Sequence, residues 1–186
     1  MARIVVACPA MHVAVTAFGA DRPGIAAAVS KVLFEHGGNV EDSRMAILGG
    51  HFAMMLIVAL PDGTEPAALE SALAPPARAL DLIVAVRPVA EVPSEHAEGS
   101  PYIVTVYGAD KPGIVYRVCQ TLAGHRVNVT DLATRVVGGE APVYVMILEA
   151  TVPAGADAAI VEADLKTLAA EMAVDVAFHP VEAETL

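Results

Sequence analysis

The spacing of apolar residues predicts two helices and four strands in the first half of the chain. Apolar residues at positions 25, 29, 32 and 33 form a helical stripe within residues 23–36. Residues 11–18, 39–48, 52–60 and 82–89 are rich in Val, Ile, Leu and Met and predict strands, with Gly49, Gly50 and His51 in a hairpin turn. A second helix is expected at 64–80, although Pro75 and Pro76 interrupt its end. The order is βαββαβ, which is typical of a ferredoxin-like unit.

The same pattern occurs again 89 residues later. Between positions 15 and 50, 16 of 36 residues are identical to those of the second half, far more than composition alone would give. The strands of the second copy are expected at 102–107, 127–137, 143–151 and 174–179, and its helices at 112–125 and 157–172. The sequence therefore predicts an α+β protein of two ferredoxin-like domains, residues 1–90 and 101–186, joined by a polar linker at 91–100.

Composition narrows the classes of function. The formal net charge is −11, and no cluster of Lys or Arg occurs, so direct binding to DNA or RNA is not expected. The two cysteines, Cys8 and Cys119, have no metal-ligand or disulfide spacing. No apolar run reaches the ~18 residues of a membrane span. These features predict a cytoplasmic protein without a metal or cofactor.

The loop before the first helix of each copy is the strongest local motif. A helix N-terminus offers unpaired backbone N–H groups to a carboxylate, and the Asp carboxylate offers an acceptor to an ammonium group. Glycine lets a ligand approach the backbone closely. The candidate ligand-binding residues are Asp21, Arg22, Pro23, Gly24 and Ile25 in the first copy and Asp110, Lys111, Pro112, Gly113 and Ile114 in the second.

Asn39 and Val40 follow the first helix of the first copy, and Asn128 and Val129 follow the first helix of the second copy at the same spacing. The strand that begins at Asn39 is expected beside the first strand, which would turn the Asn39 side chain toward the Asp21 loop. A free amino acid needs both a carboxylate receptor and an ammonium receptor, so the motif predicts an amino-acid site. The same residues also make a good turn and helix start, and Pro23 is expected in the first helical turn.

The pair of Asp-(Arg/Lys)-Pro-Gly-Ile loops, each followed by Asn-Val, resembles two ACT domains. That family has the βαββαβ fold, and many members bind amino acids at domain or subunit interfaces. The resemblance implies ligand contacts for Asp21, Asn39, Asp110 and Asn128. Many binding members have His two positions before the Asp, where this chain has Gly19 and Gly108, which fits a small ligand or an empty site.

Within the family, the first copy resembles the glycine cleavage system transcriptional repressors, which consist of two ACT domains alone. The resemblance runs through Thr16 to Ile25 and Asn39 to Gly49 and includes the signature Glu41, Asp42, Ser43 and Arg44, a candidate partner contact. The second copy has Thr130-Asp131-Leu132-Ala133 there, so the two loops are not expected to be equivalent. The resemblance implies glycine as the effector and a transcription activator protein as the partner.

The sequence therefore predicts a non-enzymatic regulator. A regulatory subunit of an amino-acid metabolic enzyme and a small ferredoxin-like hydrolase, with Arg22 binding an anion, remain as alternatives. Pairing of open sheet edges or packing of helices predicts a homodimer. His36 and His125 are expected to be structural at helix C-termini, and Met45, Met54 and Met55 to fill core gaps. Arg44 is expected on a half-exposed strand, facing Asp42, a ligand or a partner.

Overall fold

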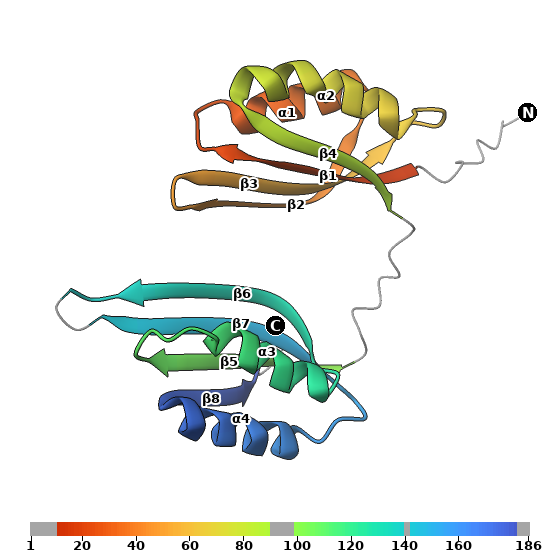
Figure 1. Cartoon of the computed structure of the whole chain (residues 1–186). Coiled ribbons are helices and arrows are strands. Elements are labelled where there is room, and N and C mark those ends of the chain that lie inside the picture. The colour runs from red at the N-terminus through yellow and green to blue at the C-terminus, as the bar shows by residue number, and fades with distance from the viewer. Residues whose placement is uncertain (1–10, 90–98, 140–141, 182–186) are drawn as a thin grey trace, which may run out of the picture. The chain divides into compact units, whose positions relative to one another are not determined.

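The computed structural model describes residues 11–89, 99–139 and 142–181. The chain divides into two compact units, Met1–Val92 and Pro93–Leu186. Each unit contains one sheet with two helices on one of its faces (Figure 1). The predicted α+β class and the ferredoxin-like order of elements are confirmed in both.

The first unit contains a four-stranded antiparallel sheet in the order β2-β3-β1-β4. The central strands are therefore β3 and β1, and β2 pairs with β3 alone. The elements are β1 (Met11–Ala20), α1 (Ile25–Glu35), β2 (Asn39–Leu48), β3 (His51–Leu60), α2 (Pro66–Leu80) and β4 (Leu82–Val89). The expectation that the strand beginning at Asn39 lies beside the first strand is wrong, because β3 lies between them.

The second unit repeats this topology with the order β6-β7-β5-β8. Its first strand starts at Gly99, so Gly99 and Ser100 belong to the sheet rather than to the expected linker. The elements are β5 (Gly99–Gly108), α3 (Ile114–Gly124), β6 (Asn128–Val137), β7 (Val143–Pro153), α4 (Ala158–Met172) and β8 (Val174–Pro180).

Side chains that alternate along the central strands form the core of each unit. Val13, Val15 and Ala17 of β1 point toward the helices and are buried, as are alternate residues of β3 from Phe52 to Leu60. The helices complete the core with residues spaced four apart, such as Leu69 and Leu73 of α2. Burying each such aliphatic side chain contributes about 1.5–3 kcal/mol. The second unit has the same arrangement around Val104, Met146 and Leu165.

Two local expectations fail in the first unit. Pro75 and Pro76 lie inside α2, which continues to Leu80, so they do not end the helix. Met54 is buried, but Met45 and Met55 are more than half exposed and do not fill the core. All ten residues of β2 are exposed, because β2 is an edge strand and the helices do not cover it.

Turns and helix ends use residues with positive φ. Gly49 and Gly50 have φ of 57° and 78° and form the two-residue turn of the β2–β3 hairpin, as predicted. Edge strand β2 also contains a register shift at Glu41, and β6 has the matching shift at Thr130. After α1 the left-handed position is Gly37, but in the second unit it is Arg126, with φ of 59°.

A left-handed backbone at Arg126 predicts that Arg126→Gly stabilises the chain. Left-handed φ costs a residue with Cβ about 1–2 kcal/mol, and the extra freedom of glycine in the unfolded chain offsets part of the gain. We expect the free energy of unfolding in urea to rise by roughly 0.5–1 kcal/mol. The control, Ala163→Gly in the right-handed helix α4, should lower it by about 1 kcal/mol. A loss of stability in Arg126→Gly would contradict the assignment of strain to this position.

Candidate functional site

The first candidate loop, residues 21–25, joins β1 to α1. Gly24 has φ of 95°, a left-handed value that favours glycine, and it directly precedes the first helical residue. Pro23 is therefore outside the helix rather than in its first turn. The side chain of Ile25 is buried beneath the helix and holds the loop against the sheet. The glycine is required by backbone geometry, whether or not a ligand approaches it.

The N-terminus of α1 is open. No side chain of the described residues caps it, and its first backbone bond runs from the Ala28 N–H to the Gly24 carbonyl at 2.9 Å. A Cβ added at Gly24 would meet no atom within 4 Å. The helix dipole and the uncapped N–H groups of residues 25–27 therefore face space that an anionic group can enter.

Asp21 is tied to the neighbouring hairpin through its backbone. Its N–H donates to the Gly50 carbonyl at 2.9 Å, while its side chain remains exposed. The side chain of Arg22 is also exposed, and within the described parts of the chain no hydrogen bond or ion pair joins it to another residue. The loop thus presents one carboxylate and one guanidinium beside the helix N-terminus.

The second loop, residues 110–114, has the same backbone. Gly113 has φ of 93°, Ile114 is buried, and the Arg117 N–H donates to the Gly113 carbonyl at 2.9 Å. Lys111 differs from Arg22, because its Nζ donates to the carbonyl of Met172 at the end of α4, at 2.7 Å. The cation of the second loop is therefore already used to join two elements of its own unit.

Tyr144 lies near the second loop and was not among the residues expected from the sequence. Its side chain is 7 % exposed, and among the described residues its hydroxyl has no hydrogen-bond partner of normal geometry. Burial raises the pKa of Tyr144, and the nearby Asp110 carboxylate raises it further, while the Thr134 hydroxyl lowers it. The first unit has Phe52 at the equivalent position, opposite Gly19, so comparing the two copies after their length difference would have found it.

Asn39 does not lie near Asp21. Asn39 and His12 both pair with Ala59, which places Asn39 level with the start of β1. Asp21 follows the end of β1, nine residues beyond His12, or about 30 Å away at the usual rise of a strand. The second unit is the same, because Asn128 and Pro101 both pair with Thr151. The expectation that each Asn faces the loop of its own copy is wrong.

The remaining signature residues follow Asn39 along the exposed edge strand. Val40 precedes the register shift at Glu41, and Val129 precedes the one at Thr130. The Glu41 carboxylate lies 2.9 Å from Nε2 of His12, and the Asp42 carboxylate accepts the Ser43 N–H at 2.7 Å. Arg44 lies on the same strand, which is fully rather than half exposed. The signature is therefore a surface feature remote from the Asp21 loop.

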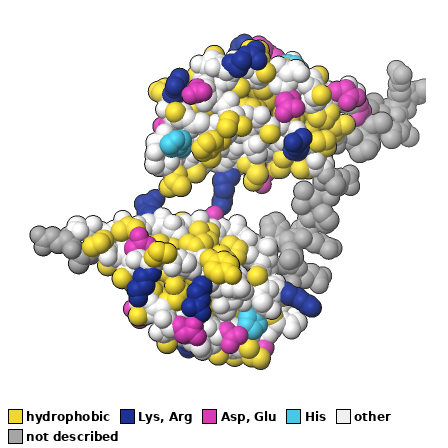
Figure 2. All heavy atoms as spheres, viewed as in Figure 1, with side chains coloured by type: hydrophobic (Ala, Val, Ile, Leu, Met, Phe, Trp, Pro, Cys, Tyr) yellow, Lys and Arg dark blue, Asp and Glu magenta, His cyan; other side chains and the backbone are white. Residues whose placement is uncertain are grey.

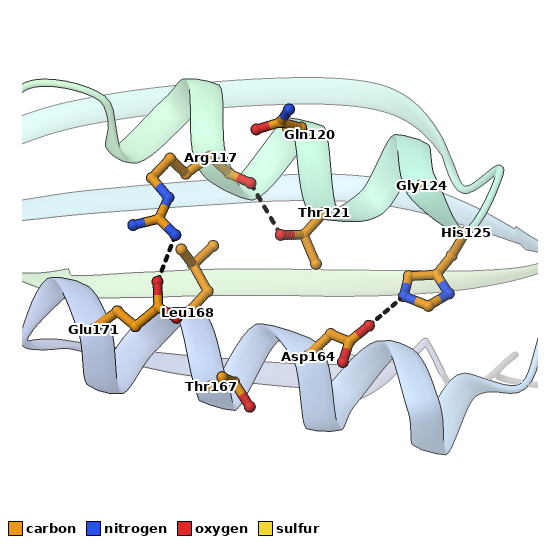
Figure 3. Close-up of a pocket in the computed structure, with 9 residues that line it drawn as sticks. All are labelled: Arg117, Gln120, Thr121, Gly124, His125, Asp164, Thr167, Leu168 and Glu171. Atoms are coloured by element: carbon orange, nitrogen blue, oxygen red, sulfur yellow. Dashed lines mark hydrogen bonds and ion pairs between the residues drawn. The ribbon is translucent and has the colours of Figure 1, made fainter.

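A polar groove of about 490 Å³ lies between α3 and α4 of the second unit (Figure 3). Arg117 and Glu171 form an ion pair toward one end, and Nε2 of His125 lies 2.8 Å from Asp164 toward the other. Because these side chains bind one another across the groove, they join the two helices. His125 thus has a structural contact, and His36 has another, from Nδ1 to the Val32 carbonyl at 2.8 Å.

The other candidate features give no site. No group of His, Cys, Asp and Glu that could hold a metal occurs in the described residues. None of the helices there is long and apolar enough to span a membrane. Cys119 is a free, partly buried thiol packed against the core, and Cys8 lies outside the described residues. On the face shown in Figure 2, Lys and Arg side chains are scattered rather than clustered.

Comparison with known proteins is consistent with the repeat. A family model of the ACT domain matches residues 11–87 and 100–179. The glycine cleavage system transcriptional repressor of Escherichia coli (strain K12) is 31% identical over 165 residues, covering 87% of this chain and 85% of the repressor. A UPF0237 protein of Methanopyrus kandleri is 50% identical over 48 residues, 26% of this chain and 53% of that protein.

A solved structure extends the similarity to three dimensions. The crystal structure of an unknown protein from Galdieria sulphuraria has a TM-score of 0.79 and 30% sequence identity, and the match covers 92% of this chain and 99% of that one. The fold is therefore shared over nearly the whole of that chain.

The unsatisfied hydroxyl of Tyr144 predicts that Tyr144→Phe, which copies Phe52 of the first unit, costs no stability. Removing a buried hydroxyl without a partner removes a desolvation penalty, so the free energy of unfolding at neutral pH should stay the same or rise by up to about 1 kcal/mol. Tyr116→Phe, at an exposed position, is the control and should change little. A loss of more than about 1 kcal/mol in Tyr144→Phe would instead reveal a hydrogen bond, with Thr134 as the nearest candidate.

The pH dependence gives a second readout of the same variant. Because burial raises the pKa of Tyr144 in the folded chain, the hydroxyl of the unfolded chain ionises first, above about pH 10. Its contribution to stability is complete below that pH and is lost as the pH rises. The wild-type free energy of unfolding should therefore fall more steeply above pH 10 than that of Tyr144→Phe, as measured by urea unfolding across this range.

Proposed function

The chain belongs to the ACT domain family, and on that premise we propose that it is a non-enzymatic regulator, acting in the cytoplasm, that senses a small amino acid. Glycine is the first effector to test, because the chain is similar to a glycine cleavage system transcriptional repressor over most of its length. The observation that carries the proposal is the doubled loop, in which an exposed Asp stands beside a helix start formed by a left-handed glycine.

The loop supports recognition of a zwitterion. The uncapped N–H groups of α1 suit the ligand carboxylate, and the exposed carboxylate of Asp21 suits its ammonium group. The space around Gly24 is open, whereas Gly19, two residues before the Asp, is packed against Asp81 and Leu82 and offers no side chain to a ligand, which favours a small ligand. Because Asn39 lies at the other end of the sheet, the part of the site that one unit offers is the loop alone.

The two loops support unequal roles. In the first, Arg22 is available to a ligand, whereas in the second Lys111 binds the Met172 carbonyl. The second loop instead has the buried hydroxyl of Tyr144 beside Asp110. We therefore assign binding of the small effector to the first loop and a separate, weaker or absent site to the second.

A regulatory role without catalysis fits these groups better than hydrolysis. An enzyme that cleaves an anhydride or phosphate ester needs a general base beside the anion-binding group. In each loop the titratable side chain beside Arg22 or Lys111 is the carboxylate of Asp21 or Asp110, which we assign to the ammonium group of the ligand rather than to a general base. A hydrolase would be indicated only if turnover of acyl phosphates depended on Arg22.

The proposed output is a protein contact. The net charge of −11 opposes direct binding to nucleic acid, so regulation of transcription would pass through a transcription activator protein. A metabolic enzyme is the second candidate partner, and the signature residues Glu41 to Arg44 on the exposed edge strand are the candidate contact. Mutual dependence of effector binding and partner binding would follow from linkage.

Isothermal titration of the full chain with single amino acids tests the proposal. We expect glycine, or another small amino acid, to bind with one site per chain, and larger side chains to bind at least tenfold more weakly. Asp21→Asn removes the charge that holds the ammonium group and should weaken binding at least tenfold, while Asp110→Asn should change it little. Asp62→Asn, at an exposed loop position in the same unit, is the control for net charge.

Each outcome has a defined meaning. Binding that depends on Asp110 rather than Asp21 would reverse the assignment of the loops. Binding that neither substitution alters would place the ligand elsewhere and overturn the site. If no amino acid binds at millimolar concentration, the sensing role is wrong and a protein-interaction module is left.

A further inference from the structure

The sheet face of the first unit that lies opposite its helices is apolar and open. We call it the open face; it consists of alternate residues from His12 to Ala20 on β1 and from His51 to Ala59 on β3, with outward residues of β2 and β4 at its sides. The ten outward residues of β1 and β3 include no Asp, Glu, Lys or Arg. Phe18 is 49 %, Met55 53 % and Ile83 72 % exposed.

An antiparallel sheet with one face in water normally alternates apolar and polar residues. Here seven of the ten outward residues of β1 and β3 are apolar, the others being His12, Thr16 and His51, and so apolar an outer face is closer to that of strands covered on both sides. A shallow hollow of about 330 Å³ on this face, beside Phe18 and Met55, further shows that it is not filled by the unit itself. The open face therefore has the composition of an interface.

Large and small side chains alternate on the two central strands. Phe18 of β1 pairs with Ala53 of β3, so the large residue is on β1. At the next outward pair the order reverses, because Thr16 lies beside Met55. At the pair of Ala14 with Ile57 the large residue is again on β3. Each pair thus has one large and one small member.

This arrangement is complementary to itself. A two-fold axis parallel to the strands and midway between β1 and β3 places β1 of one copy over β3 of a second copy at the same level. Phe18 then lies over Ala53 of the second copy, and Met55 lies over Thr16. Large side chains meet small ones throughout, as close packing of two sheets about 10 Å apart requires.

Charges at the sides of the face match the same axis. Four residues lie side by side across the sheet at one level: Asp42 of β2, Ile57 of β3, Ala14 of β1 and Arg87 of β4. The axis exchanges β2 with β4, so Asp42 lies over Arg87 of the second copy, and the reverse pair forms by symmetry. Such rim pairs contribute more to register than to affinity. One level away, Arg44 lies over Ala85 of the second copy, and at the level after that, Ala46 lies over Ile83.

The corresponding face of the second unit also has exposed apolar residues and a hollow of about 320 Å³, but it lacks the pairing of large with small side chains. Tyr107 pairs with Val145, so two large residues lie side by side where the first unit has Phe18 and Ala53. Glu149 is at the position of Ile57 and would place a carboxylate in the middle of an apolar contact. The complementary pattern belongs to the first unit alone.

We propose that the open face of the first unit is the dimer interface of this protein, packed against the open face of a second copy. Four strands about 4.8 Å apart and eight residues long give roughly 500 Å² on each copy, or roughly 1,000 Å² in total. That area is near the lower limit for a specific interface, which is typical of weak, reversible association. The assignment does not depend on amino-acid binding.

Sedimentation equilibrium of the full chain between about 1 and 100 μM tests the interface. The wild type should approach a mass twice its 19.2 kDa. Met55→Glu puts a carboxylate over Thr16 of the second copy and should raise the dissociation constant at least tenfold. Ile147→Glu, at the equivalent position of the second unit, is the matched control and should leave dimerisation unchanged. Circular dichroism and thermal unfolding are the controls that both variants fold.

A charge exchange tests the register. Asp42→Arg places two cations opposite each other and should weaken the dimer several-fold, and the double variant Asp42→Arg with Arg87→Asp should restore it. A monomeric wild type would overturn the proposal and leave the face to a different protein. A dimer that survives Met55→Glu, or one that Ile147→Glu breaks equally, would place the interface elsewhere. Failure of the double variant to restore the dimer would exclude the proposed axis.

Discussion

The pairing register of the central strands β1 and β3 is the constraint on which the first unit depends. In a strand, successive side chains point to opposite faces, so the register decides which residues are buried by the helices and which form the open face. A slip of one residue would expose Val13 and Val15 and bury His12 and Thr16. The two-residue Gly49–Gly50 turn joins β2 to β3 and fixes the register of β2 against β3.

Register also explains why the loop is a defined site. Strand β1 ends and strand β3 begins next to residues 21–25. The backbone of Asp21 therefore reaches the Gly50 carbonyl, while Ile25 enters the core. The left-handed Gly24 then turns the chain into α1 with its N–H groups uncovered. The helix start is thus held from two sides by contacts that do not use its polar groups, which leaves those groups available to a ligand.

The fold and the loops could be predicted from the sequence, since the repeat supplied two independent examples of each element. The position of Asn39 could not, because chain order does not show that β3 lies between β2 and β1. Met45 and Met55 were expected in the core for a similar reason. The sequence alone does not distinguish an apolar residue on an edge strand, or on the outer face of a sheet, from a buried one. Tyr144 could be found only by aligning the two copies across the segment in which they differ in length.

The register shifts at Glu41 and Thr130 also protect the chain from aggregation. Both lie in edge strands, β2 and β6, whose outer N–H and C=O groups would otherwise present a straight template to other chains. An extra residue increases the local twist, so identical strands cannot stack in register over their length. Pairing of two folded copies through β2 would therefore be limited to the regular stretch after the shift, which ends with the exposed Ile47 and Leu48.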